Sequence, residues 1–206
     1  MASGIKKLLI TAFIMVVIVF LLSVFYPFGF LKIVRWAGLL LFLLLVWFFR
    51  DPERSSPDEE NNILSPADGR VTSIIIKDGK TRIAIFMSIF NVHVNRIPIT
   101  GKVIEKKYTP GRYVPAFNPN CHLQNEQSEV TISNNKIKVK IIQIAGLLAR
   151  KIVNNLKSNM QVVAGQRYGM IKLGSRVDIE FPASCTLECV KGQQVKAGQT
   201  VLAKIG

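Results

Sequence analysis

The hydrophobic pattern divides the chain into an apolar N-terminal quarter and a longer part of mixed character. Two uncharged or nearly uncharged runs, at about residues 8–28 and 31–49, are long enough to be helices that cross a bilayer. Trp36 and Trp47 lie near the two ends of the second run, which is typical of an aromatic belt at a membrane interface. Residues 1–50 are therefore predicted to form a membrane anchor, a helical hairpin whose two ends emerge on the same side.

A cleaved signal peptide is the alternative explanation of this N-terminus. Lys6 and Lys7 would suit the basic start of such a peptide. However, no small-residue cleavage site separates the two apolar runs, and the second run would still remain as an anchor. The pattern favours the hairpin.

Beyond the anchor, the pattern changes to a polar stretch and then to short apolar strands. Residues 51–62 hold two prolines, two serines and six charges, which indicates a linker. Residues 63–206 have the length of one domain with its own core. Two runs rich in β-branched residues flank Asp78-Gly79, and another two flank Asn134-Asn135, so each pair is predicted to be a β-hairpin.

The remaining segments suggest one helix and a closing set of short strands. Leu147, Leu148, Ile152 and Leu156 recur at helical spacing and predict the helix. Evenly spaced small and branched residues in "GQQVKAGQTVLAKIG" resemble the final hairpins of a lipoyl/biotinyl-type β-sandwich, and "ADGRVTSI" resembles its first strand. The predicted fold class is therefore mainly β (α+β), with a lipoyl-like sandwich after the anchor. The lysine-bearing tip of a lipoyl carrier is absent, so this resemblance concerns the fold alone.

Charge and cysteine content indicate which binding partners and which cellular compartment to expect. From residue 51 onward the chain carries 22 basic and all 13 acidic residues, a net charge of +9, which favours attraction to anionic lipid headgroups. Nucleic acid is not predicted, because no arginine-rich run, helix-turn-helix pattern or aromatic platform occurs. Three cysteines without a repeating pattern fit a reducing cytoplasm. The two histidines complete no zinc-ligand spacing, and no metal is predicted.

Three residues are candidates for chemistry, and each has a simpler explanation. Gly174-Ser175 can be an ordinary bend, yet a serine after glycine can also attack the preceding carbonyl and shift the acyl group from nitrogen to oxygen. His93 falls in a strand-like run in which Phe90, Val92 and Val94 would share one face. It would then share a polar face with the neighbouring asparagines, which suits either packing or a groove. Asp68 in "SPADGRV" is good turn chemistry, or a carboxylate that orients an imidazole.

Taken together, these segments resemble a known family. "SPADGRV", "FMSIFNVHVNRIPITGKV", "NEQ", "QIAGLLARKIV" and "RYGMIKLGSRVDIEFP" occur in the order found in phosphatidylserine decarboxylase proenzymes, most similarly in the short, membrane-anchored branch of bacteria and archaea. The resemblance covers about residues 50–206 and is densest at residues 167–182. It implies that Ser175 is a reactive residue and not a bend.

The resemblance implies a self-cleaving decarboxylase of an aminophospholipid. The chain would divide between Gly174 and Ser175 into a β chain, 1–174, and an α chain, 175–206, with residue 175 becoming a covalent pyruvoyl group, the only cofactor implied. That group would form a Schiff base with phosphatidylserine, release carbon dioxide and give phosphatidylethanolamine. The enzyme would be a lyase of phospholipid biosynthesis that is made as a zymogen.

The resemblance also assigns roles to single residues. Ser175 is the nucleophile and the pyruvoyl precursor, His93 a base or acid, and Asp68 its orienting carboxylate. Arg96 and Arg176 are nominated to hold the phosphate or the departing carboxylate. Longer members carry His-x-x-His before the proline, whereas this chain keeps one histidine there and has arginine at the fourth position. Two duties would therefore fall on His93.

Several alternatives remain open from sequence. An ether-linked archaetidylserine would present the same reacting headgroup as phosphatidylserine. A non-enzymatic lipoyl-like module tethered at the membrane is the alternative from another functional class, and a decarboxylase of a free amino acid fits the apolar hairpin poorly. The expected location is the cell membrane, with residues 63–206 facing the cytoplasm. The expected partners are the bilayer, its aminophospholipid and the two cleaved chains, and a homo-oligomer is neither required nor excluded.

Overall fold

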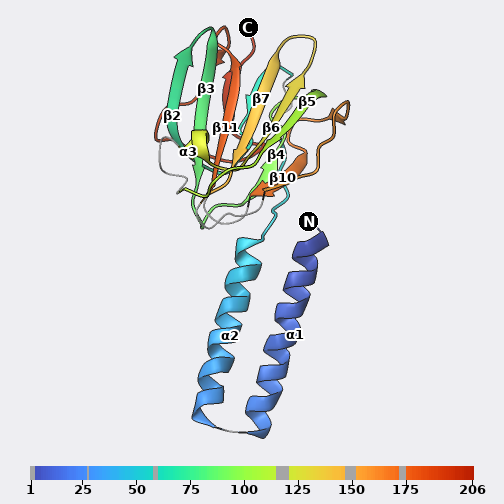
Figure 1. The fold of residues 1–206 in the computed structure, drawn as a ribbon, viewed down its shortest axis with the longest axis vertical. Coiled ribbons are helices and arrows are strands. Elements are labelled where there is room, and N and C mark those ends of the chain that lie inside the picture. The colour runs from blue at the N-terminus through green and yellow to red at the C-terminus, as the bar shows by residue number, and fades with distance from the viewer. Residues whose placement is uncertain (1–2, 27, 58–59, 115–120, 147–151, 172–174) are drawn as a thin grey trace. The chain divides into compact units, whose positions relative to one another are not determined.

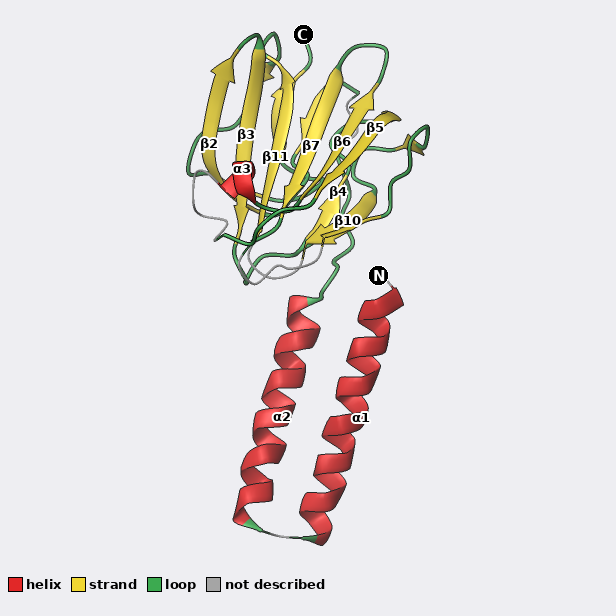
Figure 2. Cartoon of the chain, viewed as in Figure 1, coloured by secondary structure: helices red, strands yellow, loops and turns green. Residues whose placement is uncertain are grey.

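The computed structural model describes residues 3–26, 28–57, 60–114, 121–146, 152–171 and 175–206. The chain divides into two compact units, residues 1–52 and residues 53–206. Figure 1 traces both units from the N-terminus to the C-terminus. The first unit is helical, and the second is mainly β, which confirms the predicted fold class at that level (Figure 2).

The helical unit consists of two helices that pack side by side and run in opposite directions. They are α1 (Ser3–Phe25) and α2 (Gly29–Phe48), and the ring centroids of Phe13 and Phe42 lie 5.8 Å apart between them. Segments Lys7–Phe25 and Gly29–Phe48 are long and apolar enough to cross a membrane. The predicted hairpin of helices is thus present, and its placement in a membrane stays a prediction.

The β unit is built from antiparallel strands in three sheets. Among the described residues the largest sheet has eight strands in the order β13-β2-β3-β11-β7-β6-β5-β9, and it curls over two three-stranded sheets, β1-β14-β12 and β4-β10-β8. The strands are β1 (Asn62–Leu64), β2 (Gly69–Lys77), β3 (Lys80–Met87), β4 (Val94–Arg96), β5 (Gly101–Thr109), β6 (Gln127–Ser133), β7 (Lys138–Ile144), β8 (Ile152–Asn154), β9 (Gln161–Val162), β10 (Arg167–Ile171), β11 (Ser175–Pro182), β12 (Thr186–Leu187), β13 (Gln194–Val195) and β14 (Val201–Lys204). One short helix, α3 (Cys121–Gln124), lies beside the large sheet. The lipoyl-like label remains a prediction.

Both predicted hairpins are present, and local turn chemistry explains the first of them. Asp78 and Gly79 have φ values of 51° and 70°, the left-handed pair that a two-residue hairpin turn needs. They join β2 to β3, and the Asn134-Asn135 region joins β6 to β7 in the same antiparallel manner. In β6 buried residues alternate with half-buried ones, as expected of a strand with one face on the core.

The helix predicted around residues 147–156 is wrong in its second half. Ile152–Asn154 is strand β8, which pairs with β10, and Leu156 is buried in the core cluster. Residues 147–151 lie outside the described residues. An apolar spacing of three or four residues fits a short buried strand as well as a helix, and here the pairing with β10 decides.

The core lies between the curled sheet and the two small sheets. On β11, Val177, Ile179 and Phe181 share the core face, whereas the residues between them point to the other face of the sheet. Because successive side chains of a strand alternate, Ser175 lies on the same face as Val177, and Arg176 lies on the opposite one. This alternation separates two groups of polar residues at the beginning of β11.

Candidate active site

Ser175 is the first residue of β11, the strand that pairs with both β3 and β7. Its side chain is fully buried, and its register partner on β3 is Met87. The Ser175 hydroxyl lies 3.5 Å from the Met87 sulfur. A hydroxyl on the core side of a central strand is shielded from bulk water. Gly174 lies outside the described residues, so the geometry of the Gly174-Ser175 bond is not part of this description.

The segment that contains His93 reaches the same place from β4. His93 directly precedes β4 and is fully buried, and so is Asn95 two residues later. The side-chain amide nitrogen of Asn95 lies 3.8 Å from the Met87 sulfur, which the Ser175 hydroxyl also contacts. Met87 thus stands between Ser175 and the β4 segment. The structure therefore brings the His93–Asn95 segment and Ser175 to a common side chain.

The predicted alternation over Phe90–Val94 is wrong, because a turn interrupts the strand. The Asn91 side-chain oxygen accepts hydrogen bonds from the Ser88 amide and hydroxyl, at 2.9 and 2.8 Å, and the Asn91 amide donates to the Ser88 carbonyl. These local bonds compete with strand pairing and end β3 at Met87. As a result Phe90 is exposed, while Val92 and His93 are both buried.

A buried chain of amides extends the site away from Asn95, and sequence reasoning missed it. The Gln143 side chain donates to the Asn95 oxygen at 2.8 Å, and its own oxygen accepts from Asn154 at 3.0 Å. Asn154 also lies 3.0 Å from the Ser128 hydroxyl. Gln143 and Asn95 are fully buried. Fully connected polar groups of this kind fix the geometry of a core, so this chain supports the position of β4 next to Ser175.

Gly169 makes room for this chain of amides. It pairs with Asn95 on one side and with Asn154 on the other. A Cβ added there would lie 2.2 Å from the Val153 carbonyl oxygen and 3.2 Å from the Gln143 amide nitrogen. Only glycine allows β10 to approach β8 so closely while Gln143 passes between the two asparagines.

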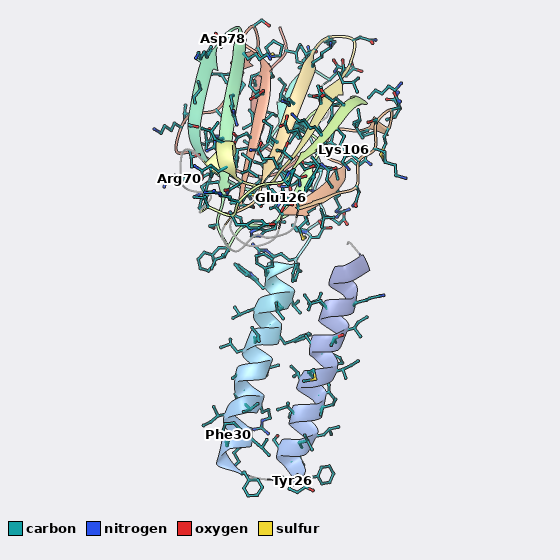
Figure 3. The ribbon with its side chains drawn as sticks, in the orientation of Figure 1. Tyr26, Phe30, Arg70, Asp78, Lys106 and Glu126 are labelled. Carbon is teal, nitrogen blue, oxygen red and sulfur yellow. The ribbon has the colours of Figure 1, made fainter. Side chains whose placement is uncertain are left out.

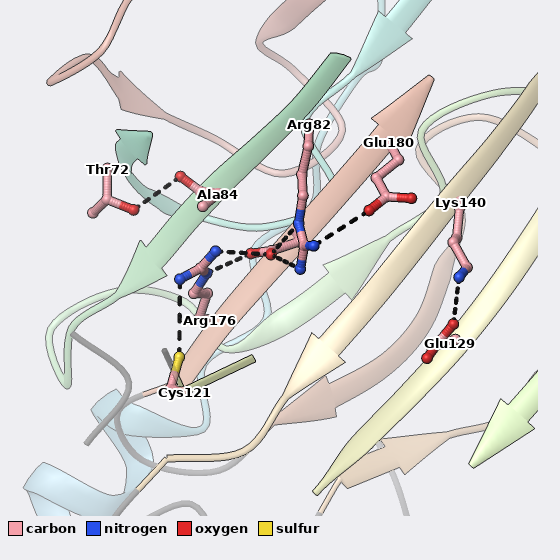
Figure 4. Close-up of polar contacts among 9 residues, drawn as sticks. Thr72, Arg82, Ala84, Cys121, Glu129, Lys140, Arg176 and Glu180 are labelled. Atoms are coloured by element: carbon pink, nitrogen blue, oxygen red, sulfur yellow. Dashed lines mark hydrogen bonds and ion pairs between the residues drawn. The ribbon is translucent and has the colours of Figure 1, made fainter. Parts of the chain in front are cut away.

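On the opposite face of β11, a buried carboxylate holds two arginines. Asp178 accepts from Arg176 at 2.5 and 2.9 Å and from Arg82 at 2.8 and 2.6 Å. Figure 4 shows Arg82 and Arg176 approaching each other from neighbouring strands, with the Cys121 sulfur 3.9 Å from Arg176. Burial disfavours the charged form of Arg176, but its hydrogen bond to Asp178 and the charge of that carboxylate outweigh burial and raise the Arg176 pKa. This ion cluster anchors the strand directly after Ser175.

Asp68 is engaged by the segment that was predicted to be a linker. Arg54 donates to both carboxylate oxygens of Asp68, at 2.5 and 2.8 Å, and the Ala197 amide donates to one of them at 2.8 Å. Both side chains of this ion pair are about nine-tenths buried. Among the described residues these are the partners of Asp68. Its role in orienting His93 stays a prediction.

Arg96 lies at the end of β4 and is buried. Its guanidinium donates to the Gly165 carbonyl at 3.1 Å, and its backbone amide donates to the Pro66 carbonyl at 2.9 Å. The second bond places the segment that leads to Asp68 directly alongside β4. Close packing of Gly198 against the Arg96 side chain completes this corner, since a Cβ on Gly198 would lie 2.9 Å from the Arg96 Cδ.

Comparison with known proteins shows which family the chain resembles. The sequence profile of the phosphatidylserine decarboxylase family matches residues 41–203. The chain belongs to the phosphatidylserine decarboxylase family. It is 44% identical over 171 residues to a phosphatidylserine decarboxylase proenzyme of Pelodictyon phaeoclathratiforme, covering 80% of this chain and 81% of the relative.

Two more relatives carry the likeness through almost the whole chain, the N-terminal apolar part included. A phosphatidylserine decarboxylase proenzyme of Chlorobium phaeobacteroides is 39% identical over 207 residues, which is 98% of this chain and 97% of the relative. That of Chlorobaculum tepidum is 38% identical over 195 residues, 92% of this chain and 90% of the relative. The resemblance inferred from sequence motifs is thus confirmed.

Within this phosphatidylserine decarboxylase family member, the predicted site residues form three groups. Ser175 and the His93 segment meet at Met87, Arg176 joins the ion cluster on the other face of β11, and Asp68 and Arg96 lie in adjoining segments connected through the Pro66 carbonyl. In the described part of the chain, no group of three or more histidine, cysteine, aspartate or glutamate side chains is arranged to hold a metal ion.

A surface hollow of this family member lies at the other end of the sheet from Ser175. It is lined by side chains around the β2–β3 turn and the far ends of β7 and β11, including Asp78, Lys80, Lys138 and Pro182. Because β11 begins at Ser175 and ends at Pro182, the hollow and Ser175 are at opposite ends of the sheet. The hollow therefore includes neither Ser175 nor Met87.

Proposed function

We propose that this chain is a phosphatidylserine decarboxylase proenzyme that cleaves itself between Gly174 and Ser175. The products would be a β chain, residues 1–174, and an α chain, residues 175–206, that begins with a pyruvoyl group. The observation that carries the proposal is the buried serine at the start of β11, inside a chain that matches curated proenzymes of this name along almost its whole length. No observation favours a non-enzymatic lipoyl-like adaptor.

Self-cleavage follows from the chemistry of a serine after glycine. The Ser175 hydroxyl attacks the Gly174 carbonyl, an oxygen–carbon bond forms, the carbon–nitrogen bond breaks, and the amide becomes an ester. Loss of the Ser175 Cα proton then expels the Gly174 carboxylate from Cβ. Addition of water and release of ammonia leave a keto acyl group at residue 175. Glycine before the serine leaves the attacked carbonyl uncrowded.

His93 is the proposed base for the Ser175 hydroxyl. It is buried on the segment that reaches Ser175 through Met87 and Asn95, and an imidazole can take and return a proton near neutral pH. Asp68 is proposed to orient His93, which requires its carboxylate to exchange part of its contact with Arg54. Exclusion of water around Ser175 protects the ester from simple hydrolysis.

The pyruvoyl group, once formed, supplies an electron sink for the loss of carbon dioxide from the amine-linked headgroup. The residues around Ser175 suit such a group, because a buried, mostly apolar surrounding with Met87 and Asn95 leaves a small keto group shielded from water. His93 is proposed to return a proton to the substrate carbon, and Arg96 and Arg176 to attract the negative groups of the lipid. Phosphatidylserine is the proposed substrate because the relatives carry that name.

The proposed place of action is the cell membrane. The two N-terminal helices would anchor the chain, and the β unit would face the cytoplasm, where its three buried cysteines stay reduced. The lipoyl-like sandwich is the proposed fold of the β unit, on the resemblance of its first and last strands.

The proposal predicts that purified protein is two polypeptides. Mass spectrometry should find a large piece and a piece of 32 residues, the number from Ser175 to Gly206. The small piece should resist N-terminal sequencing and react with hydroxylamine or borohydride at its keto group. An intact chain of 206 residues without a trappable carbonyl would overturn the proposal.

Replacement of His93 by alanine should slow self-cleavage by about 10²–10⁴-fold, the contribution that a general base typically makes. The fraction of cut chain is followed by gel electrophoresis after synthesis is stopped. His122→Ala, at the other histidine of the chain, is the matched control and should cut at the normal rate. If His93→Ala matures normally yet fails to decarboxylate, His93 serves substrate protonation alone.

A further inference from the structure

The turn after β3 exposes two large apolar side chains. Ile89 is 44% exposed and Phe90 is 67% exposed, although they are adjacent in sequence and follow a buried strand. The Ser88–Asn91 hydrogen bonds hold this turn in one shape, and the Phe90 amide adds a bond of 3.3 Å to the Ser88 hydroxyl. Apolar side chains that a turn holds outward do not contribute to folding the free energy that their burial would give.

This turn lies at the end of the sheet where the chemistry is placed. Met87, which pairs with Ser175, comes two residues before Ile89. A third exposed apolar residue, Leu123, belongs to α3 and is 73% exposed. The Cys121 sulfur of α3 contacts Arg176, so this short helix also borders the beginning of β11. We define Ile89, Phe90 and Leu123 as the apolar rim.

Exposed cations accompany the apolar rim at the same end. Arg70 is the second residue of β2 and pairs with Phe86, whereas Asp78 directly follows the other end of that strand, and Figure 3 shows the two far apart. The exposed Arg112 is held next to α3, because its amide donates to the Gln124 carbonyl at 2.7 Å. Apolar side chains flanked by arginines are the composition of surfaces that enter the interface of anionic bilayers.

We propose that the apolar rim inserts into the interfacial layer of an anionic bilayer, so that the headgroup of a membrane lipid is presented to the Ser175 end of the sheet. The inference rests on the proposed function for the identity of the lipid. The partner is a bilayer and not a protein, because the cations match anionic headgroups and the β unit carries an excess of positive charge. Ile89 and Phe90 would enter the layer between the headgroups and the acyl chains, about 5–10 Å deep.

A single fluorescent label tests the insertion directly. The native cysteines are buried, and burial raises the pKa of the Cys185 and Cys189 thiols, so a thiol placed at residue 90 reacts selectively. The Phe90→Cys full chain is labelled with a nitrobenzoxadiazole probe and reconstituted in nanodiscs of phosphatidylglycerol and phosphatidylethanolamine. The matched control is Ile76→Cys, because Ile76 is 62% exposed near the other end of β2.

Lipids with nitroxide-labelled chains should quench the probe at residue 90 and leave the probe at residue 76 unquenched. The probe at residue 90 should also emit about twofold more strongly when the protein is in nanodiscs than when it is in buffer that contains only a water-soluble analogue of the headgroup. This increase is expected for transfer into an interfacial layer. Equal quenching at both residues, or none at residue 90, would overturn the proposal.

A kinetic test separates this proposal from the proposed function. Phe90→Ser should lower decarboxylation of phosphatidylserine in nanodiscs by about tenfold, from the loss of one large apolar side chain at the interface. It should leave the rate on a dispersed short-chain phosphatidylserine and the cut at Ser175 unchanged. An equal loss on both substrates would overturn the rim as a bilayer surface. Absence of the cut in wild-type protein would instead count against the proposed function.

Discussion

Replacing Ser175 with alanine should leave the protein as one uncut chain of 206 residues with no decarboxylase activity above background. Alanine keeps the strand but removes the oxygen that attacks the Gly174 carbonyl, and without the cut no keto group forms. Because the one hydrogen bond of the Ser175 hydroxyl among the described residues goes to the Met87 sulfur, its loss should leave the fold intact. Mass spectrometry of the purified chain and release of carbon dioxide from phosphatidylserine are the two measurements.

Two further variants make this result specific. Ser184→Ala removes an exposed serine from the same C-terminal segment and should cut and decarboxylate normally. Ser175→Cys keeps a nucleophile at the same position and should still cut, at a changed rate. Two pieces from the Ser175→Ala chain would show that another group carries the cleavage, and the mechanism proposed above would be wrong.

Short-range signals in the sequence were sufficient for much of the fold. The hairpin at Asp78-Gly79 depends on two residues that adopt left-handed backbone angles. This dipeptide is itself the sequence signal for such a turn, so no distant contact is needed to predict it. Strand β8 was missed because its identity comes from pairing with β10, which lies more than ten residues further along the chain. The turn at Ser88–Asn91 was missed because side-chain hydrogen bonds overrode a strand-like pattern.

The candidate site, like the fold, could be predicted from sequence only in part. Ser175 and His93 were nominated because their motifs resemble those of a family, whereas Asn95, Gln143 and Asp178 lie within the same quoted segments but were given no role. Their only signal is a polar residue in an otherwise apolar strand, which predicts a partner without naming it. The pairing of Asp68 with Arg54 was also missed, since no local pattern says which residue of a polar segment docks on a distant carboxylate.

These contacts suggest a division of labour around β11. On the core face, Met87 and the amide chain fix the segment that carries His93 next to Ser175. On the opposite face, the ions around Asp178 fix the strand that Ser175 begins. Self-cleavage needs the hydroxyl in one orientation toward the carbonyl before it. The ion cluster is therefore expected to matter for maturation as well as for stability.

Replacing Asp178 with alanine should destabilise the β unit by about 3–5 kcal/mol, the typical cost of removing one partner of a buried ion pair. Asp178 is fully buried and is shared by Arg82 and Arg176, whose side chains are 26% and 9% exposed. Without the carboxylate, Arg176 would remain as a buried charge with fewer partners. The free energy of unfolding is measured by urea titration of the full chain in detergent, on the uncut Ser175→Ala background, so that one polypeptide unfolds in every sample.

Glu180→Gln is the matched control for Asp178→Ala. Glu180 lies two residues further along the same face of β11, its nearest carboxylate oxygen is 3.5 Å from Arg82, and its side chain is 20% exposed. A more exposed ion pair contributes about 0–1 kcal/mol, so this variant should unfold close to the parent chain. On the Ser175-containing background, Asp178→Ala should also accumulate uncut chain, while Glu180→Gln should not. Equal stability of the two variants would show that the carboxylate of Asp178 is not what holds the beginning of β11 in place.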